Sequence, residues 1–291
     1  MRWISVVFIS LLLSVYGCGE DKKSGSSESG EASGDPGFPE DDEDWEDPEE
    51  VEEVDDPEAS SFSEDDSDEL REEKYGNGQN KTKVYMRRDD NDNYVRVGPW
   101  KAWHRNGNVK ESGHYDEGKK VGRWETWYKK GQKESVRHFK DDVEHGSFTV
   151  WKKNGQLRES GTHFEGKEHG TWKRWFKSKP QQEFEKNYNM GRKTGRWITW
   201  RTSGKKKDET HYQFDVKHGE AGTWFKKGEP ESKGAYKRGN KDGPWTTWHR
   251  NGQKKMEATF ELGERVPGTI SEWTSKGKLR DPERVRVYLY G

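Results

Sequence analysis

The sequence predicts an all-β protein: an elongated, single-layer antiparallel meander of about eight stacked β-hairpin repeats, with a disordered N-terminal tether. Three observations lead to this fold class. A glycine recurs every 24 or 25 residues, a tryptophan follows each of these glycines by five positions, and turn-forming dipeptides recur twice in most repeats. A fixed period in this range is the signature of a repeat architecture.

The N-terminus has the pattern of an export signal. Arg2 precedes an apolar run from Trp3 to Val15, which is the length of a signal-peptide core and too short for a spanning helix. Residues 15–18, Val-Tyr-Gly-Cys, resemble the bacterial lipobox, which implies cleavage after residue 17 and a lipid on Cys18. Because Gly19 is not aspartate, this resemblance favours the outer membrane. An ordinary secreted protein with an incidental cysteine is the alternative.

An acidic linker is predicted for residues 18–75. Residues 1–75 hold 26 acidic and 5 basic side chains, whereas residues 76–291 hold 29 acidic and 48 basic ones. The linker is rich in Ser, Gly, Pro, Asp and Glu, a composition that cannot bury enough apolar surface to fold. A solvated tether beside a basic body is therefore expected. Contact between the acidic segment and the basic repeats remains an alternative, while the spacing of a calcium loop is absent.

The repeats are predicted to cover residues 98–280, with starts at residues 98, 122, 146, 170, 195, 219, 243 and 268. The tryptophans at the fifth position, called the tryptophan row below, are Trp103, Trp127, Trp151, Trp175, Trp200, Trp224, Trp248 and Trp273. A second large side chain follows most starts by two positions: Trp100, Trp124, Phe148, Trp172, Trp197 and Trp245. Ala221 and Ile270 replace it in the remaining two repeats.

Each repeat is predicted to be one hairpin. Asn106-Gly107 is a signal for a two-residue turn in which both residues have positive φ. That turn places Trp100 opposite Gly113 and Tyr115 opposite Gly98. The equivalent aromatics are Phe139, Tyr212, Tyr236 and Phe260. Phe164 and Tyr188 come one position late, so bulges are expected in the third and fourth repeats.

Alternation along a strand should direct Trp100 and Trp103 to opposite faces. One face would hold the structural aromatics named above. The other would hold the tryptophan row, with the cations Lys110, Arg158, Lys207 and Lys255 opposite its members. This second face is the candidate contact surface. The alternative is that the row is structural and that the Lys and Arg stems simply cover it.

The ends should be irregular, since terminal repeats cap such arrays. Residues 76–97 resemble a half repeat that turns at Gly78, and residues 281–291 contain a short strand suited to closing the far edge. About 16 strands at ~4.8 Å each give a body roughly 75 Å long.

Catalytic and metal-binding patterns are missing from the sequence. Three histidines share one repeat position (His114, His138 and His211), but equivalent residues of adjacent hairpins lie ~9–10 Å apart, too far to share an ion. No phosphate-binding loop, nucleophile elbow or paired metal motif occurs. The sequence therefore indicates no enzyme, no metal and no cofactor.

The pattern Gly-x-Trp-x-x-Trp with Asn-Gly, Tyr and Gly at fixed distances resembles the MORN repeat in its bacterial variant form. The resemblance implies a sheet of stacked hairpins that serves as a scaffold for proteins or lipids. The resulting expectation is a membrane-anchored, non-enzymatic binding protein of the bacterial envelope, with an unknown protein as its partner. Alternatives are a glycan or anionic-lipid binding module, and an antitoxin or immunity protein; nucleic acid is the less expected ligand.

Overall fold

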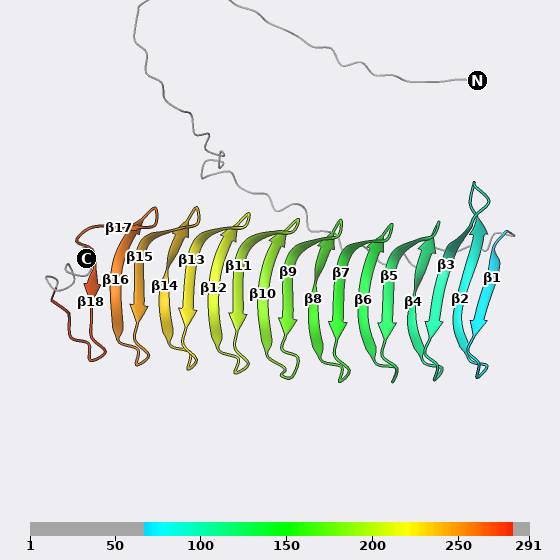
Figure 1. Cartoon of the computed structure of the whole chain (residues 1–291), viewed down its shortest axis with the longest axis horizontal. Helices are drawn as coiled ribbons and strands as arrows, with labels where there is room; N and C mark the ends of the chain where they lie inside the picture. Colours follow the sequence, from blue (N-terminus) through cyan, green and yellow to red (C-terminus); the bar gives the residue numbers. More distant parts are fainter. Residues whose placement is uncertain (1–66, 282–291) are drawn as a thin grey trace, which may run out of the picture. The chain divides into compact units, whose positions relative to one another are not determined.

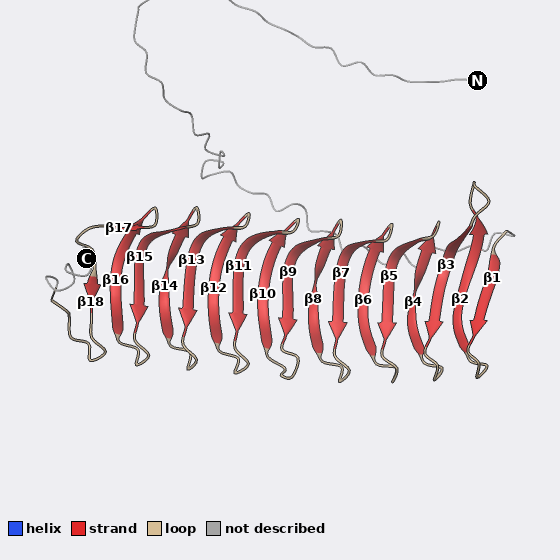
Figure 2. Ribbon diagram, in the orientation of Figure 1, coloured by secondary structure: helices blue, strands red, loops and turns tan. Residues whose placement is uncertain are grey.

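The structure, a computed structural model, describes residues 67–281, which form one 18-stranded antiparallel sheet (Figure 1). Each strand up to β16 pairs with the next strand of the chain, so that the sheet is an open meander, and β16 also pairs with the two short strands β17 and β18. Figure 2 shows strands and turns only, in a single layer. The predicted all-β repeat fold is confirmed.

The strands have the following bounds: β1 Glu69–Lys74, β2 Asn80–Arg88, β3 Tyr94–Trp103, β4 Val109–Asp116, β5 Lys119–Trp127, β6 Lys133–Lys140, β7 Val143–Trp151, β8 Leu157–Phe164, β9 Lys167–Trp175, β10 Gln182–Asn189, β11 Arg192–Trp200, β12 Lys206–Gln213, β13 Val216–Trp224, β14 Pro230–Lys237, β15 Asn240–Trp248, β16 Lys254–Glu261, β17 Glu264–Arg265 and β18 Ser271–Glu272. Each predicted tryptophan-row residue up to Trp248 is the last residue of its strand. The eighth repeat keeps only β18 and a bridge between Trp273 and Leu279, as expected for a terminal copy.

The sheet begins earlier in the chain than the sequence indicated. β1, Glu69–Lys74, lies inside the predicted linker but pairs with β2 along its whole length. The predicted turn at Gly78 is present, with a φ of 82°. The linker prediction therefore fails for residues 69–74, whereas the signal peptide, Cys18 and the predicted closing strand at 285–290 lie outside the described residues.

The turn after each tryptophan is one residue longer than predicted. The amide of Gly107 donates to the carbonyl of His104, and Gly107 has a φ of 85°, but Asn106 is not among the described residues with positive φ. This is a type I turn followed by a left-handed glycine, the common three-residue hairpin loop. A bulge on β4 then restores the predicted pairing of Trp100 with Gly113. The prediction of a two-residue turn at this end was wrong.

Two-residue turns with positive φ at both positions occur instead at the other end of the hairpins. Glu117 and Gly118 have φ of 42° and 84°, and Asp141 and Asp142 have 51° and 68°. These values are typical of type I′ turns, whose twist matches that of the flanking strands. Bulky Phe214 and Leu262 also adopt this conformation, with φ of 46° and 47°.

The repeat period follows from the glycine that begins each repeat. All eight of these glycines have positive φ, from 52° at Gly195 to 97° at Gly146. At Gly122 the register between β4 and β5 shifts, so that one residue of β4 faces three residues of β5. A bulge with a left-handed backbone conformation costs conformational energy for any residue with a Cβ. This cost explains why glycine recurs at this position.

The third and fourth repeats depart from the frame in different ways. In the fourth, Tyr188 lies opposite Gly170 because the turn over residues 176–181 is one residue longer. In the third, His163 and not Phe164 lies opposite Gly146, and no extra bulge is inserted. Neither repeat therefore has the additional bulge that was expected, because the fourth repeat takes up its extra residue in the turn.

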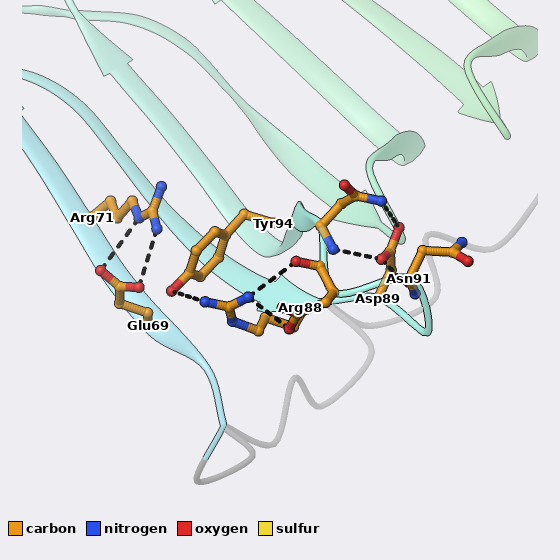
Figure 3. A network of polar contacts seen from close by, with 8 residues as sticks. Glu69, Arg71, Arg88, Asp89, Asn91 and Tyr94 are labelled. Carbon is orange, nitrogen blue, oxygen red and sulfur yellow. Dashed lines mark hydrogen bonds and ion pairs between the residues drawn. The ribbon is translucent and has the colours of Figure 1, made fainter.

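The N-terminal edge strand, β1, and the strand beside it carry charged side chains. Figure 3 shows the guanidinium of Arg71 beside the carboxylate of Glu69. These two groups are 3.1 Å apart, and the guanidinium of Arg88 on β2 lies 2.6 Å from the carboxylate of Asp92. Both guanidinium groups also stack on the ring of Tyr94, at 4.1 and 4.5 Å from its centroid. Charged side chains on an edge strand oppose pairing with a further chain.

Candidate binding surfaces

One face of the sheet, here called the aromatic face, holds a ladder of packed rings. Trp100 meets Tyr115 at 5.8 Å between ring centroids, Tyr115 meets Trp124 at 5.0 Å, and Trp124 meets Phe139 at 6.3 Å, all edge to face. The ladder resumes from Phe148 to Tyr212 and again from Tyr236 to Phe260. Trp124 is only 3% exposed although the sheet has one layer. These aromatics form the core of the protein.

The indoles of the aromatic face also bind the preceding strand. The Nε1 of Trp124 donates to the carbonyl of His114, and Trp172, Trp197 and Trp245 make the equivalent bond at 2.8–3.0 Å. The ring of Trp124 lies on Gly113, where an added Cβ would come within 3.0 Å of it. The aromatic residue that covers Gly113 most closely thus comes from the next repeat. Trp100, from the same hairpin as Gly113, is its partner in the strand register.

A line of charges lies over this ladder, two positions before each repeat glycine. Lys120 lies 3.8 Å from the ring of Trp124, Lys241 lies 4.5 Å from Trp245, and Lys193 lies 4.9 Å from Trp197. The middle of the sheet is different, because Glu144 and Glu168 take this position. These cation–π contacts assign the cations a packing role.

The two central acids have partners of their own. Glu144 lies 2.9 Å from His163 and 2.7 Å from Arg137. The hydrogen bond with His163, aided by Arg137, lowers the pKa of Glu144 despite its partial burial. Burial, aided by the charge of Glu168, raises the pKa of Tyr188 to about 12.

The tryptophan row lies on the opposite face. All eight of its members are partly exposed, and none is buried. The cations predicted opposite them are displaced by the bulge: Trp103 pairs with Val109, Trp151 with Leu157, Trp200 with Lys206 and Trp248 with Lys254. Lys110, Arg158, Lys207 and Lys255 are the extra residues of these bulges and are exposed. The prediction that these four cations lie directly opposite the tryptophans was therefore wrong, and the same position in alternate repeats holds the acids Glu134, Glu183 and Glu231.

Ion pairs occupy much of the space between the tryptophans. Glu125 contacts Arg123 at 2.6 Å and Lys133 at 2.5 Å. Glu209 binds Arg196 and Lys206, and although burial raises the pKa of Glu209, these two bonds give a net lowering. Lys206 also lies 4.6 Å from the ring of Trp224. This face is consequently a mixed surface of half-exposed indoles and paired charges.

Neighbouring repeats are also joined by a hydrogen bond that the sequence did not reveal. In four repeats the residue after the tryptophan bonds to the carbonyl of the next tryptophan along the sheet: Tyr128 to Trp151 at 2.8 Å, His104 to Trp127 at 2.8 Å, Arg201 to Trp224 at 2.7 Å and His249 to Trp273 at 2.9 Å. The sequence feature that could have indicated this bond is a polar side chain directly after the tryptophan. Phe176 and Phe225 hold the same position and cannot donate.

The histidines act as single polar contacts in the structure. His138 bonds to the carbonyl of Ser147 at 2.7 Å, and His211 bonds to that of Glu220 at 2.9 Å. Among residues 67–281, no three His, Cys, Asp or Glu side chains are grouped so that they could hold a metal ion.

One pocket of about 450 Å³ opens between the sixth and seventh repeats. Its lining combines hydroxyls, an aromatic pair and cations: Thr223, Phe225, Ser232, Thr247, Trp248 and His249, together with Glu231, Arg250 and Lys255. The guanidinium of Arg250 lies 5.8 Å from the ring of Phe225.

Comparison with known families supports the repeat assignment. The model of the MORN repeat variant matches residues 96–117 and 241–261, the first and the seventh predicted copies. The copies between them have the same hairpin register, except for the fourth, whose longer turn offsets it by one residue. Two segments of the chain match this repeat variant, and the tandem antiparallel hairpins are consistent with a MORN-repeat protein. No curated protein matches the chain.

Repeats of this type generally mediate binding to proteins or to membrane lipids and typically form scaffolds rather than catalytic centres. In the described part of the chain, no helix has the length and apolar character required to cross a bilayer.

Proposed function

We propose that this MORN-repeat protein is a non-catalytic scaffold of the bacterial envelope, anchored by a lipid on Cys18, that binds a partner protein along its tryptophan row. The observation that supports this role is that the two faces of the sheet differ in what their aromatic side chains do. The aromatic face uses its rings to hold the hairpins together, whereas the tryptophan row presents eight partly exposed indoles at a regular spacing. Large, rigid aromatics in such positions are the side chains that dominate protein interfaces.

The row can be tested by capture of partners from an envelope extract with the full chain. A single protein that stays bound through a salt series is expected, because burial of indoles is insensitive to screening. Replacement of Trp151 and Trp175 by serine should abolish this capture, while serine at Tyr94, an exposed aromatic outside the row, should not. Equal capture by all three proteins, each shown to be folded by circular dichroism, would exclude the row as the interface.

The anchor has a separate test. Replacement of Cys18 by alanine should move the protein from the membrane fraction to the soluble fraction, since the lipid has no other attachment site in this scheme. If the variant fractionates with membranes as the unchanged protein does, the lipid anchor is wrong, but the scaffold role would still stand.

A further inference from the structure

The two long edges of the sheet differ in charge. Nine turns lie on one edge, shown at the bottom in Figure 1, and comprise residues 75–79, 104–108, 128–132, 152–156, 176–181, 201–205, 225–229, 249–253 and 274–278. We call them the basic turn edge, because they contain 14 Lys and Arg side chains and one acid, Glu229. Twelve of these 14 cations are exposed; Lys152 and Arg201 are half-buried.

The opposite edge does not share this character. Its turns, residues 89–93, 117–118, 141–142, 165–166, 190–191, 214–215, 238–239 and 262–263, contain eight acids and one cation, Arg238. The strand ends beside these turns add cations such as Lys119 and Lys167, so this edge is mixed. The positive charge of the repeats is thus concentrated along one straight line of loops.

We propose that the basic turn edge binds a linear acidic polysaccharide, and that the pocket beside Phe225 receives one of its sugar residues. Successive turns are two strand spacings apart, about 9.6 Å, and the line is one turn wide. A regular line of cations at constant spacing matches a polymer that carries a charge at regular intervals. Eleven of the 14 cations are lysines, which act as hydrated point charges and do not require the bidentate geometry of arginine.

The turn tips argue against a bilayer as the primary ligand. They consist of triplets such as Lys129-Lys130-Gly131, Lys226-Lys227-Gly228 and Arg250-Asn251-Gly252. Surface-bound membrane segments bury apolar side chains between the head groups, and these tips have none to insert. Single-stranded nucleic acid requires exposed rings on which bases stack, whereas the Tyr and Phe residues of these turns are partly buried: Tyr75, Tyr128, Phe176 and Phe225.

The pocket supplies the saccharide chemistry. Phe225, His249 and Arg250 belong to the basic turn edge, so the pocket opens directly beside it. Hydroxyls of Thr223, Ser232 and Thr247 offer hydrogen bonds, and the hydroxyls of Thr223 and Ser232 already bond to each other at 2.9 Å. An aromatic wall with a few convergent polar groups is the usual form of a small-molecule site. Arg250 and Lys255 at its rim suit a carboxylate on the bound sugar.

The test measures binding of polygalacturonate by the full chain, with neutral dextran, polyglutamate and phosphatidylglycerol vesicles as comparison ligands. Polygalacturonate should bind more tightly than the other three, and the affinity should fall as salt rises from about 0.05 to about 0.5 M. Equal binding of polyglutamate would show charge attraction without saccharide recognition and would overturn the proposal. Preferential binding of the vesicles would overturn it in favour of a membrane ligand.

Two pairs of variants locate the site. The quadruple variant Lys129→Glu, Lys130→Glu, Lys226→Glu and Lys227→Glu should weaken polygalacturonate binding about tenfold or more. Its control, Lys119→Glu, Lys140→Glu, Lys167→Glu and Lys237→Glu, changes the net charge equally on the other edge and should have a much smaller effect. All eight lysines are exposed, so both variants should remain folded. Equal losses in the two variants would contradict an edge-specific site.

Phe225→Leu should weaken polygalacturonate binding about threefold to tenfold without changing polyglutamate binding. Phe176→Leu alters the same repeat position away from the pocket and should change neither. If the two variants behave alike, the pocket is not the saccharide site. None of the substituted residues belongs to the tryptophan row, although Trp248 of that row also lines the pocket.

Discussion

Glycine and tryptophan depend on each other at Gly113 and Gly234. Each glycine lies under an indole of the next strand, Trp124 or Trp245, so closely that a Cβ would come within 3.0 Å of the ring. The indole in turn donates to the carbonyl of the residue that follows the glycine. The absence of a side chain at the glycine therefore allows both the packing of the indole ring and its hydrogen bond.

Gly113→Ala should consequently destabilise the protein by about 2–3 kcal/mol, because the indole must leave its place or the strands must separate. Gly76→Ala is the control, since nothing lies within 4 Å of a Cβ there and its φ is not positive. Urea denaturation monitored by tryptophan fluorescence gives both values. Equal midpoints would show that the sheet accommodates the added methyl group.

Leu262 illustrates strain in the type I′ turns. It has a φ of 47°, its side chain is 66% exposed, and it precedes Gly263. Leu262→Asn should stabilise the protein by up to about 1 kcal/mol, because asparagine tolerates the left-handed conformation and Asn-Gly is the preferred type I′ pair. Leu279→Asn, which removes another exposed leucine but one without positive φ, should show no gain in thermal melting.

The contact of Glu144 with His163 and Arg137 should make stability depend on pH. Its pKa is lowered in the folded protein, so its contribution is present above the ordinary value of 4.5 and is lost as pH falls through the folded value. The melting temperatures of the protein and of Glu144→Gln should therefore differ at pH 7 and converge near pH 3. A difference that persists unchanged at pH 3 would point to shape rather than charge.

At the scale of the hairpin, two kinds of contact hold each repeat to the next. Strand pairing is common to every sheet, but the side-chain bond to the next tryptophan carbonyl, made by His104, Tyr128, Arg201 and His249, is specific to this array. Tyr128→Phe removes one such bond and leaves the ring in place. It should cost about 1 kcal/mol in urea denaturation, the usual net value of a hydrogen bond.

Tyr236→Phe is the matched control for this bond, because that ring packs on Trp245 and no hydrogen bond of its hydroxyl occurs among the described residues. A loss of equal size in both variants would indicate a general effect of removing a tyrosine hydroxyl.

The sequence was sufficient to predict the hairpins, because glycine, tryptophan and turn residues recur in a period that only stacked hairpins satisfy. It also predicted the pairing of Trp100 with Gly113 and of Tyr115 with Gly98. The residues opposite the tryptophan row were predicted wrongly because the predicted turn type was wrong. The observed three-residue loop and the bulge that follows it compensate each other, so that only the residues between the loop and the bulge are shifted. Lys110 and its equivalents were therefore displaced by one position.

The candidate surfaces were harder to predict than the fold. The tryptophan row is visible in the sequence, but which of its neighbouring charges are paired depends on the bulge, as at Glu125 and Lys133. The basic turn edge is visible only when turns are sorted by the edge on which they lie. Phe225 carries no signal in the sequence that distinguishes it from Phe176, and only the pocket does so.

At the scale of the whole sheet, contacts join mainly strands that are adjacent in the chain, and β16 also contacts β18, so the described body is close to one-dimensional. Removing one complete repeat should then leave the others unchanged. Deletion of residues 122–145 joins Val121 to Gly146 in the same frame and places Phe148 where Trp124 covers Gly113.

The shortened protein should unfold cooperatively at a somewhat lower urea concentration, and its maximum dimension in small-angle scattering should fall by about 10 Å, two strand spacings. Deletion of residues 122–139 serves as the control. It removes fewer residues but brings Lys140 to the position of a repeat glycine, where positive φ is required. If the shorter deletion were tolerated better than the full repeat, the 24-residue frame would not be the unit on which this sheet is built.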